Sequence, residues 1–149
     1  MNSKINYSSK AKSKGRKNFR LSDLAEEVKK EFFADENLFK DLFKLKSSTC
    51  LDKVFDQLEL MVKYYANSVT TSQLRNVYAE IVKTKKPNDL KLLRPKLAYI
   101  AARQDHLNAK KFMAFIDHLI QQVNTEEELQ SFKDTMEAIV AYHKLYAKN

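Results

Sequence analysis

The stretch LDKVFDQLELMVKYYANSVTTSQLRNVYAEIV, residues Leu51–Val82, decides the fold class. Its apolar side chains recur at steps of three and four residues, the spacing that places them on one face of an α-helix. Two consecutive helices are therefore predicted. Between them, Thr70 and Gln73 have the spacing of a capping box, in which each side chain bonds the backbone of the other residue.

The same spacing continues on both sides of this stretch. Before it, we expect Ser22 to cap a helix that runs to about Phe33, and a short helix over Leu38–Leu45. After it, Pro87 should end the preceding helix. Another helix is expected over Pro95–Gln104, because proline suits the first turn of a helix.

Two more helices complete the chain. Asn108 is expected to cap the first, and Thr125 with Glu128 forms a second capping-box match at the start of the last. Just after the proline that ends the earlier helix, Asn88 or Asp89 is expected to cap a turn. The chain has no alternating strand pattern, so the predicted fold is all-α.

The predicted architecture is a compact bundle of about five to seven helices in a single domain over residues 21–149. Short connections favour antiparallel packing of neighbouring helices. Residues 1–20 hold seven basic residues and no acidic one, with few apolar side chains. Such a segment buries too little apolar surface to offset the entropy lost on ordering, so it is expected to be a disordered basic tail. It would serve either as a solubilising tail or as a nonspecific arm for phosphate.

The net charge of +8 is distributed unevenly. Residues 65–111 hold ten basic and three acidic residues, whereas residues 21–64 and 112–149 each carry a net charge of −3. A basic surface within the folded part of the chain is a better candidate for a specific anionic partner than the tail is.

Composition excludes several classes of protein. The single glycine, Gly15, cannot supply a Walker loop, a dinucleotide fingerprint, an EF-hand or a nucleophile elbow. One cysteine allows no internal disulfide and no cysteine-based zinc site. The chain lacks the run of about 18 apolar residues that a membrane span needs, so we expect a cytoplasmic protein without membrane contact.

The titratable residues form no catalytic or metal-binding pattern. No pair among His106, His118 and His143 has the spacing of two ligands on one helix face, and Cys50 is distant in sequence. His143 lies on an apolar stripe, so it is interpreted as a hydrogen-bonded core or interface histidine. Glu126–Glu128 fall in the first turn of the last helix and suit its dipole. We expect no catalytic residue, no metal and no cofactor.

The basic residues between 65 and 111 fall on two expected helices. On the helix after Thr70, Arg75, Lys83 and Lys86 are predicted to lie near one face, with the small Ala79 between them. Arg75 and Lys83 are therefore candidate nucleic-acid-binding residues. An ordinary solvated face would explain the lysines equally well.

The next helix adds an aromatic ring to the cations. Lys96, Tyr99 and Arg103 have spacings of three and four residues, so they should share a stripe opposite the apolar side of the helix. Lysine and arginine neutralise phosphates, and a ring or a guanidinium plane stacks on a base. Two adjacent helices thus offer the side-chain types that bind RNA.

Three motifs in this region resemble one known family. TTSQLRNVYAEI (Thr70–Ile81), LLRPKLAYIAAR (Leu92–Arg103) and FKDTMEAIVAYHK (Phe132–Lys144) are similar, in the same order, to the small subunit of the type III-A CRISPR effector, the Csm complex. The resemblance covers roughly Val69–Tyr146. The basic tail has no counterpart in it.

The resemblance implies a non-catalytic helical subunit of an RNA-guided antiviral complex. Such subunits line up as copies in a minor filament, beside other subunits of the complex. They contact the guide RNA (crRNA) and the target RNA through basic residues, largely without reading sequence. Cleavage belongs to other subunits. The alternative is a helical protein–protein adaptor without RNA affinity of its own.

The motifs also indicate which residues would contact RNA. Arg75, Lys96 and Arg103 are the first choices, and Arg94 and Gln73 are second choices. Gln73 would instead be occupied by capping its own helix if the capping box forms. In the last motif, four residues could face the core, another subunit or RNA: Glu137, Tyr142, His143 and Lys144.

Overall fold

The computed structural model describes residues 20–148, so the predicted basic tail lies outside the described residues except for Arg20. The described chain forms helices α1 to α8 and one 3-10 turn, η2, and contains no strand. The all-α prediction is confirmed. The elements in chain order are α1 (Leu21–Phe32), α2 (Glu36–Asp41), η2 (Leu45–Ser47), α3 (Leu51–Tyr65), α4 (Thr71–Val82), α5 (Pro87–Lys91), α6 (Arg94–Ala102), α7 (Leu107–Gln121) and α8 (Glu126–Tyr146).

Both predicted capping boxes are present. The Gln73 backbone N–H donates to Thr70 Oγ1 at 3.0 Å, and the Gln73 side chain accepts from the Thr70 backbone in return. At the start of α8, the Glu128 backbone N–H donates to Thr125 Oγ1 at 3.1 Å. Each box satisfies backbone donors that the first turn of a helix leaves unpaired.

Two predictions that rest on a single capping residue, those for Ser22 and Asn108, are wrong. Arg20, not Ser22, is the N-cap of α1, and His106, not Asn108, is the N-cap of α7. Neither N-cap residue makes a side-chain capping hydrogen bond. A lone serine or asparagine is compatible with several positions at a helix start, whereas a capping box requires two matched residues.

The predicted turn after α4 is the short helix α5. Pro87 is its first residue, and the Asp89 carboxylate accepts from the backbone N–H groups of Lys85 and Lys86 at 3.2 Å each. Lys86 is the N-cap of α5 and not a residue of α4, so its predicted place on the α4 face is wrong. The carboxylate of Asp89 closes the turn because it satisfies two backbone donors at once.

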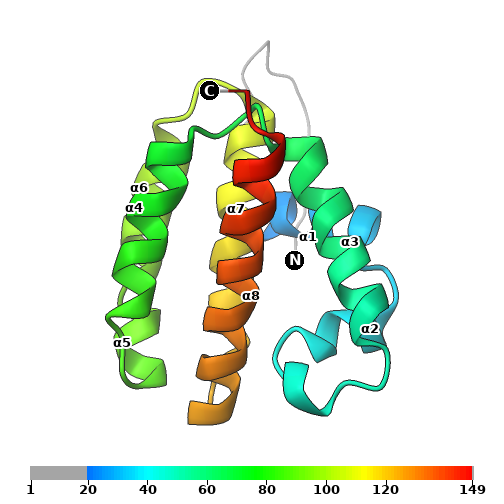
Figure 1. Cartoon of the computed structure of the whole chain (residues 1–149). Helices are drawn as coiled ribbons and strands as arrows, with labels where there is room; N and C mark the ends of the chain where they lie inside the picture. The colour runs from blue at the N-terminus through cyan, green and yellow to red at the C-terminus, as the bar shows by residue number, and fades with distance from the viewer. Residues whose placement is uncertain (1–19, 149) are drawn as a thin grey trace, which may run out of the picture.

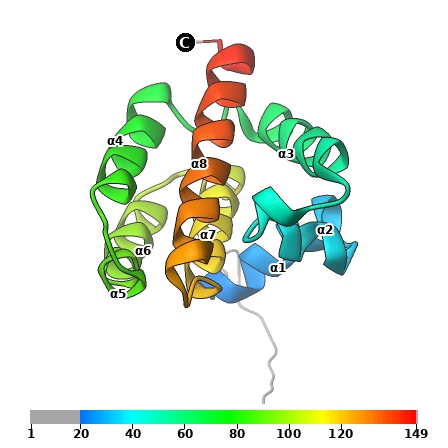
Figure 2. The same cartoon turned by 60° about the horizontal axis from the view of Figure 1, so that its bottom comes forward.

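The helix α7 lies at the centre of the molecule because it is apolar on nearly all sides. Six consecutive residues, Phe112 to Asp117, are buried, which a surface helix with one apolar stripe would not show. Helices α1 and α6 pack against α7, while α3 and α4 pack against α8. In Figures 1 and 2, α4, α5 and α6 lie on one side of the long α8, and α1, α2 and α3 lie on the other.

Buried polar groups join α8 to the rest of the fold. His143, 1% exposed, has its Nε2 2.7 Å from the Val69 carbonyl oxygen, at the connection between α3 and α4. The hydroxyl of Thr135, which is fully buried, donates to the Leu42 carbonyl at 2.9 Å. These bonds offset the cost of burying polar atoms and set the position of α8 along its neighbours.

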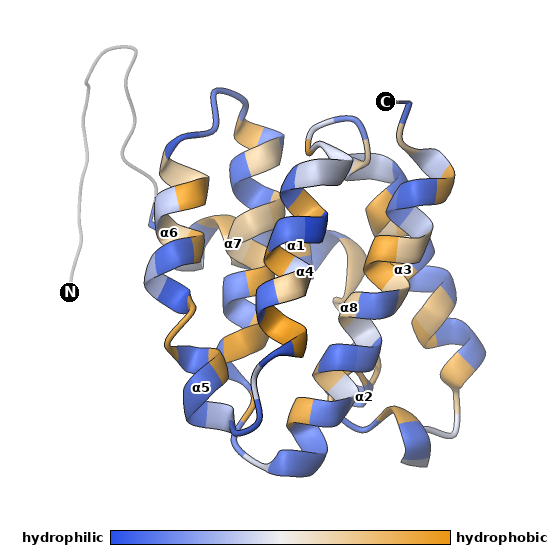
Figure 3. Cartoon of the chain, turned by 60° about the vertical axis from the view of Figure 1, so that its left-hand side comes forward, coloured by the Kyte–Doolittle hydropathy of each residue, from blue (hydrophilic) through white to orange (hydrophobic). Residues whose placement is uncertain are grey.

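In Figure 3, α4 stands in front, between α6 and α8. The buried side of α4 is formed by Leu74, Val77 and Ile81, as the helical spacing predicts. Because α4 packs on α8 while α6 packs on α7, α4 and α6 face each other without close backbone packing. Among the described helices, none is both long enough and apolar enough to cross a membrane.

Candidate nucleic-acid interface

The ten basic side chains of residues 65–111 fall into two groups in the structure. Four bond to other parts of the fold and hold helices together: Lys91, Arg94, Lys110 and Lys111. The other six belong to exposed residues on α4, on α6 or at the ends of α4, α5 and α6: Arg75, Lys83, Lys85, Lys86, Lys96 and Arg103. We refer to the second group as the six exposed cations.

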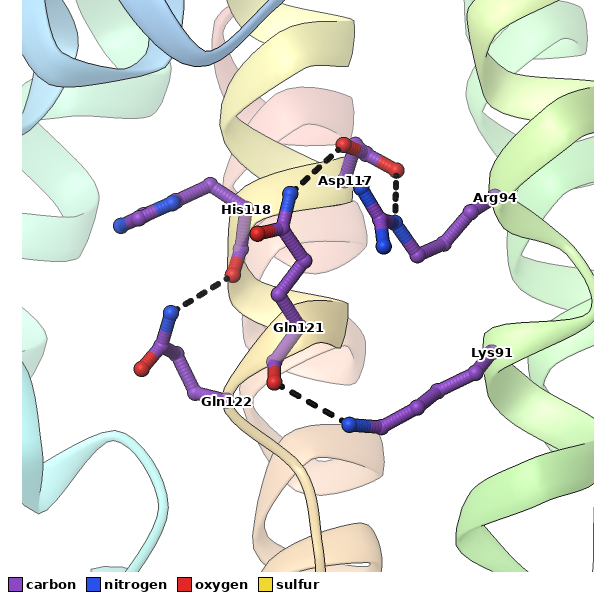
Figure 4. Close-up of polar contacts among 6 residues, drawn as sticks. All are labelled: Lys91, Arg94, Asp117, His118, Gln121 and Gln122. Carbon is purple, nitrogen blue, oxygen red and sulfur yellow. Dashed lines mark hydrogen bonds and ion pairs between the residues drawn. The ribbon is translucent and has the colours of Figure 1, made fainter.

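Arg94 is held by a buried carboxylate. Its Nε lies 3.0 Å from Asp117 Oδ1, and the Asp117 side chain is only 4% exposed. Gln121 donates to the other oxygen of Asp117 at 3.1 Å, so both carboxylate oxygens are satisfied. Figure 4 shows this network between α6 and α7, with Lys91 donating to the Gln121 backbone carbonyl at 3.2 Å. The structure thus gives Arg94 a role in the scaffold.

Lys110 and Lys111 likewise serve the scaffold. Lys111 Nζ lies 2.9 Å from Glu27 Oε1 of α1. Lys110 Nζ is 3.4 Å from each of the carbonyl oxygens of Ala101 and Ala102, at the end of α6. A lysine there is favourable because the last carbonyls of a helix lack backbone partners and carry partial negative charge.

Three of the predicted RNA-binding residues line one groove between α4 and α6. Its volume is about 710 Å³, and Gln73, Lys96 and Arg103 are among the lining residues. Tyr99 lies in the same groove, as the predicted stripe on α6 requires. On the opposite side of α6, Leu97 and Ala101 are buried. We call this feature the α4–α6 groove.

Tyr99 and Arg103 form a joined pair at the surface of the groove. Arg103 Nη1 donates to the Tyr99 hydroxyl at 2.9 Å, and the guanidinium carbon lies 5.5 Å from the centre of the tyrosine ring. The ring is nevertheless 61% exposed. The groove therefore presents an aromatic face next to a fixed positive charge.

Gln73 is occupied by contacts within the protein. Its Oε1 accepts from the Thr70 backbone at 3.1 Å as part of the capping box, and its Nε2 donates to Gln104 Oε1 at 3.5 Å. The second contact connects α4 with the end of α6. Gln73 thus positions one wall of the α4–α6 groove.

The charge of the α4–α6 groove is mixed. Its lining includes the carboxylates of Glu80 and Asp105 beside the cations Lys96 and Arg103. Lys83, just outside the lining, lies 3.5 Å from Glu80 and partly compensates that carboxylate. Charge counts along the sequence conceal this balance, because they do not show which residues share a surface.

Arg75 lies apart from the other first-choice residues. It lines a smaller groove of about 310 Å³ between α4 and α8, together with Lys144 and apolar residues that include Leu74 and Val140. The structure therefore does not bring Arg75 into the groove that holds Lys96 and Arg103. The two grooves lie on opposite sides of α4, so RNA that contacted both would cross this helix.

The four residues left open in the last motif, Phe132–Lys144, are partly in the core and partly at the surface. His143 is buried and bonded to Val69, which confirms its interpretation as a hydrogen-bonded histidine within the core. Glu137 and Lys144 are exposed, and Tyr142 is half-buried against the core.

Asn76 and His106 are groove residues that the sequence analysis missed. Asn76 lies three residues after Gln73, so the helical period places the two on one side of α4. His106 precedes α7, and nothing in the sequence indicates that this connection lines the groove.

The part of the chain that the structure describes shows no group of three or more His, Cys, Asp or Glu residues suited to hold a metal ion. Cys50 is half-buried at the N-cap of α3, with its Sγ 3.4 Å from Asp41 Oδ2. Glu126, Glu127 and Glu128 occupy the first turn of α8, where they suit the helix dipole.

Comparison with known proteins identifies the family. No curated protein and no solved structure matches the chain. The family model Csm2 Type III-A matches residues 48–149, a range that includes α3 to α8 and both grooves. The match covers more than half of the chain and includes all three motifs. The chain therefore belongs to the Csm2 Type III-A family, the small subunits of the type III-A CRISPR effector complex.

Proposed function

We propose that this small subunit binds the guide RNA–target RNA duplex through its basic residues, largely independently of sequence, as a non-catalytic part of the minor filament in cytoplasmic antiviral defence. The observation that carries the proposal is the exposure of six cations within α4–α6, on the part of the chain that matches the family. Its partners would be the two RNA strands, other subunits of the complex and further copies of itself.

The division of the ten basic residues supports this function. Four of them hold helices together. Within residues 20–148, the positive charge of the other six has no such structural role and is available to an anionic partner. Among the six exposed cations, Arg75 lies on the α8 side of α4, whereas Lys96 and Arg103 lie on its α6 side. This spread suits an extended phosphate backbone better than a small ligand. Phosphate contacts give affinity and position a protein without reading bases.

Arg75, Lys96 and Arg103 are the residues that we propose contact RNA first, followed by Lys83. An arginine offers a planar pair of donors to a phosphate, and a lysine offers a point charge. Arg94 and Gln73 remain weaker candidates because their side chains bond to Asp117, Thr70 and Gln104 inside the protein.

The test is RNA binding by the full chain as a function of salt. If about four phosphates are contacted, the slope of log affinity against log salt should be about −3. Replacement of both arginines, R75A with R103A, should weaken binding to unrelated RNA duplexes alike and reduce the slope by about two. The measurement is fluorescence anisotropy of labelled duplexes across a salt series.

A matched control removes the same charge elsewhere. Lys30 and Lys40 are exposed on α1 and α2, on the other side of α8. The K30A/K40A variant should bind RNA as the parent does, apart from the small effect of lower net charge. Equal loss in both double variants would contradict the assigned residues. Absence of RNA binding at about 100–200 mM salt, with retained assembly into a protein complex, would show a protein–protein adaptor instead.

A further inference from the structure

The α4–α6 groove is poorly suited to a row of phosphates. Its two cations, Lys96 and Arg103, are matched by two carboxylates, Glu80 and Asp105, so its lining carries no formal net charge when His106 is neutral. A phosphate chain laid along the groove would pass both carboxylates at close range, and like charges at short distance repel. The groove therefore favours a ligand whose phosphates lie only at Lys96 and Arg103 and whose remaining part is not anionic.

The polar groups in the groove suit the edge of a nucleobase. Asn76 offers an amide with both donors and an acceptor, and within residues 20–148 its side chain has no hydrogen-bond partner. An asparagine amide pairs with adenine, while a carboxylate accepts from the amino group of cytosine. The neighbouring carboxylates can thus accept hydrogen bonds from the amino groups of a base, whereas they repel a phosphate.

The ring of Tyr99 supplies the flat apolar surface that a base needs. It is 61% exposed, on the wall of a hollow of about 710 Å³, which is large enough for one nucleotide. Arg103 bonds its hydroxyl and lies 5.5 Å from the ring centre, so the ring and the guanidinium are held together. A base stacks on such a ring regardless of its sequence, because every base has a π-face.

We propose that the α4–α6 groove binds one unpaired RNA nucleobase, stacked on Tyr99, with Asn76 at its edge and with Lys96 and Arg103 on the adjoining phosphates. This inference rests on the proposed RNA-binding function and adds to it a site for a base outside the duplex. A base held in Watson–Crick pairing inside an A-form duplex presents neither of its faces to a protein side chain. The site therefore distinguishes an unpaired nucleotide from a paired one.

The experiment compares two RNA duplexes with the full chain. One duplex is fully paired, and the other is identical except for one additional unpaired fluorescent adenine analogue. The parent protein should bind the second about tenfold more tightly, the effect expected for stacking of one base on an aromatic ring. Stacking should also quench the fluorescence of the analogue on binding.

Two substitutions at Tyr99 separate stacking from other effects. Y99L keeps an apolar side chain but removes the ring and the hydroxyl bond to Arg103. It should abolish both the preference and the quenching, and it should bind the paired duplex no more weakly than Y99F, which lacks the same bond. Y99F keeps the ring and loses only the hydroxyl bond to Arg103, so it should retain both. Because the side chain is mostly exposed, neither change should unfold the protein, which circular dichroism checks.

The outcomes are distinct. A parent protein that binds both duplexes equally tightly, or a Y99L variant that weakens both to the same extent, would overturn the nucleobase site and leave the phosphate-binding function standing. A parent protein that binds neither duplex would overturn both proposals. Loss of the preference in Y99L with its retention in Y99F supports the site.

Discussion

The side chain of Arg94 is bound to the buried carboxylate of Asp117, with Nε 3.0 Å from Oδ1, and this contact joins α6 to α7. Arg94 lies two residues before Lys96 and belongs to the same motif, yet its charge is used inside the fold. The pair fixes the start of the helix that carries Lys96, Tyr99 and Arg103. The α4–α6 groove therefore depends on an ion pair whose carboxylate is buried and whose two residues do not line the groove.

Loss of Arg94 should destabilise the protein more than neutralisation of Asp117 does. R94A leaves the buried carboxylate of Asp117 with Gln121 as its remaining side-chain partner, and a buried acceptor that loses a partner costs about 1–3 kcal/mol, and more when it carries a charge. D117N keeps an oxygen that accepts from Arg94, and Arg94 is 44% exposed and still reaches water. Urea unfolding at neutral pH measures both free energies. Equal stability of R94A and the parent protein would show that the contact is energetically neutral.

Substitution of His143 should also reduce stability. H143F keeps an aromatic ring in the buried position but leaves the Val69 carbonyl without this hydrogen bond, at a cost of about 1–3 kcal/mol. H143Q retains an amide donor and should lose less. The melting temperature and the urea midpoint measure the loss. An unchanged midpoint in H143F would mean that water or a backbone group replaces the imidazole.

Stability should fall when the pH is lowered through the range in which histidine titrates. Burial lowers the pKa of His118 below its ordinary value of 6.5, and Lys29 lowers it further, while the carboxylates of Glu26, Asp117 and Glu36 act in the opposite direction. The unfolded chain then binds more protons than the folded chain between the lowered pKa and 6.5, so stability rises with pH across that window and is lost as pH falls through it.

The variant H118F isolates this effect. The ring of His118 lies 5.7 Å from that of Phe39, and phenylalanine preserves an aromatic neighbour there without a titrating group. Between about pH 7.5 and 5.5, the melting temperature of the parent protein should decrease more than that of H118F. Parallel decreases in the two proteins would assign the pH dependence to other groups.

Removal of the groove carboxylates should strengthen RNA binding. E80Q with D105N removes the charges that oppose phosphate and releases Lys83 from its 3.5 Å contact with Glu80. For such exposed charges the expected gain is about threefold, and it should shrink as salt is raised. The control E31Q/D52N removes the same charge from exposed positions on α1 and α3. Equal gains in both variants would indicate a general effect of net charge.

Local sequence patterns predicted most of the secondary structure. The two consecutive helices α3 and α4 and the capping boxes at Thr70 and Thr125 are as expected, since each depends on residues within a few helical turns. The predicted caps Ser22 and Asn108 are wrong because a single small polar residue does not specify one position at a helix start. The short helix α5 begins with one proline and is closed by the carboxylate of Asp89. The same two residue types are also typical of a turn, so the sequence predicted a turn at this place.

The candidate site was predicted in part. The stripe of Lys96, Tyr99 and Arg103 follows from the helical period alone, and these residues do line one groove. The separation of Arg75 from that stripe depends on the neighbours of α4, which its own sequence does not specify. The partner of Arg94 is 23 residues away along the chain, and no spacing rule connects two residues on different helices.

The sequence by itself determined that this chain is a basic helical protein, because helical periodicity, caps and charge are properties of residues close together along the chain. It also carried the motifs that place the chain in the Csm2 Type III-A family. Only the tertiary structure decided which cations stay at the surface and which hold helices together. That division depends on burial, which is set by how the apolar faces of α7 and α8 orient the helices packed against them. A cation has a partner on another helix only where that packing brings a carboxylate or a carbonyl close to it.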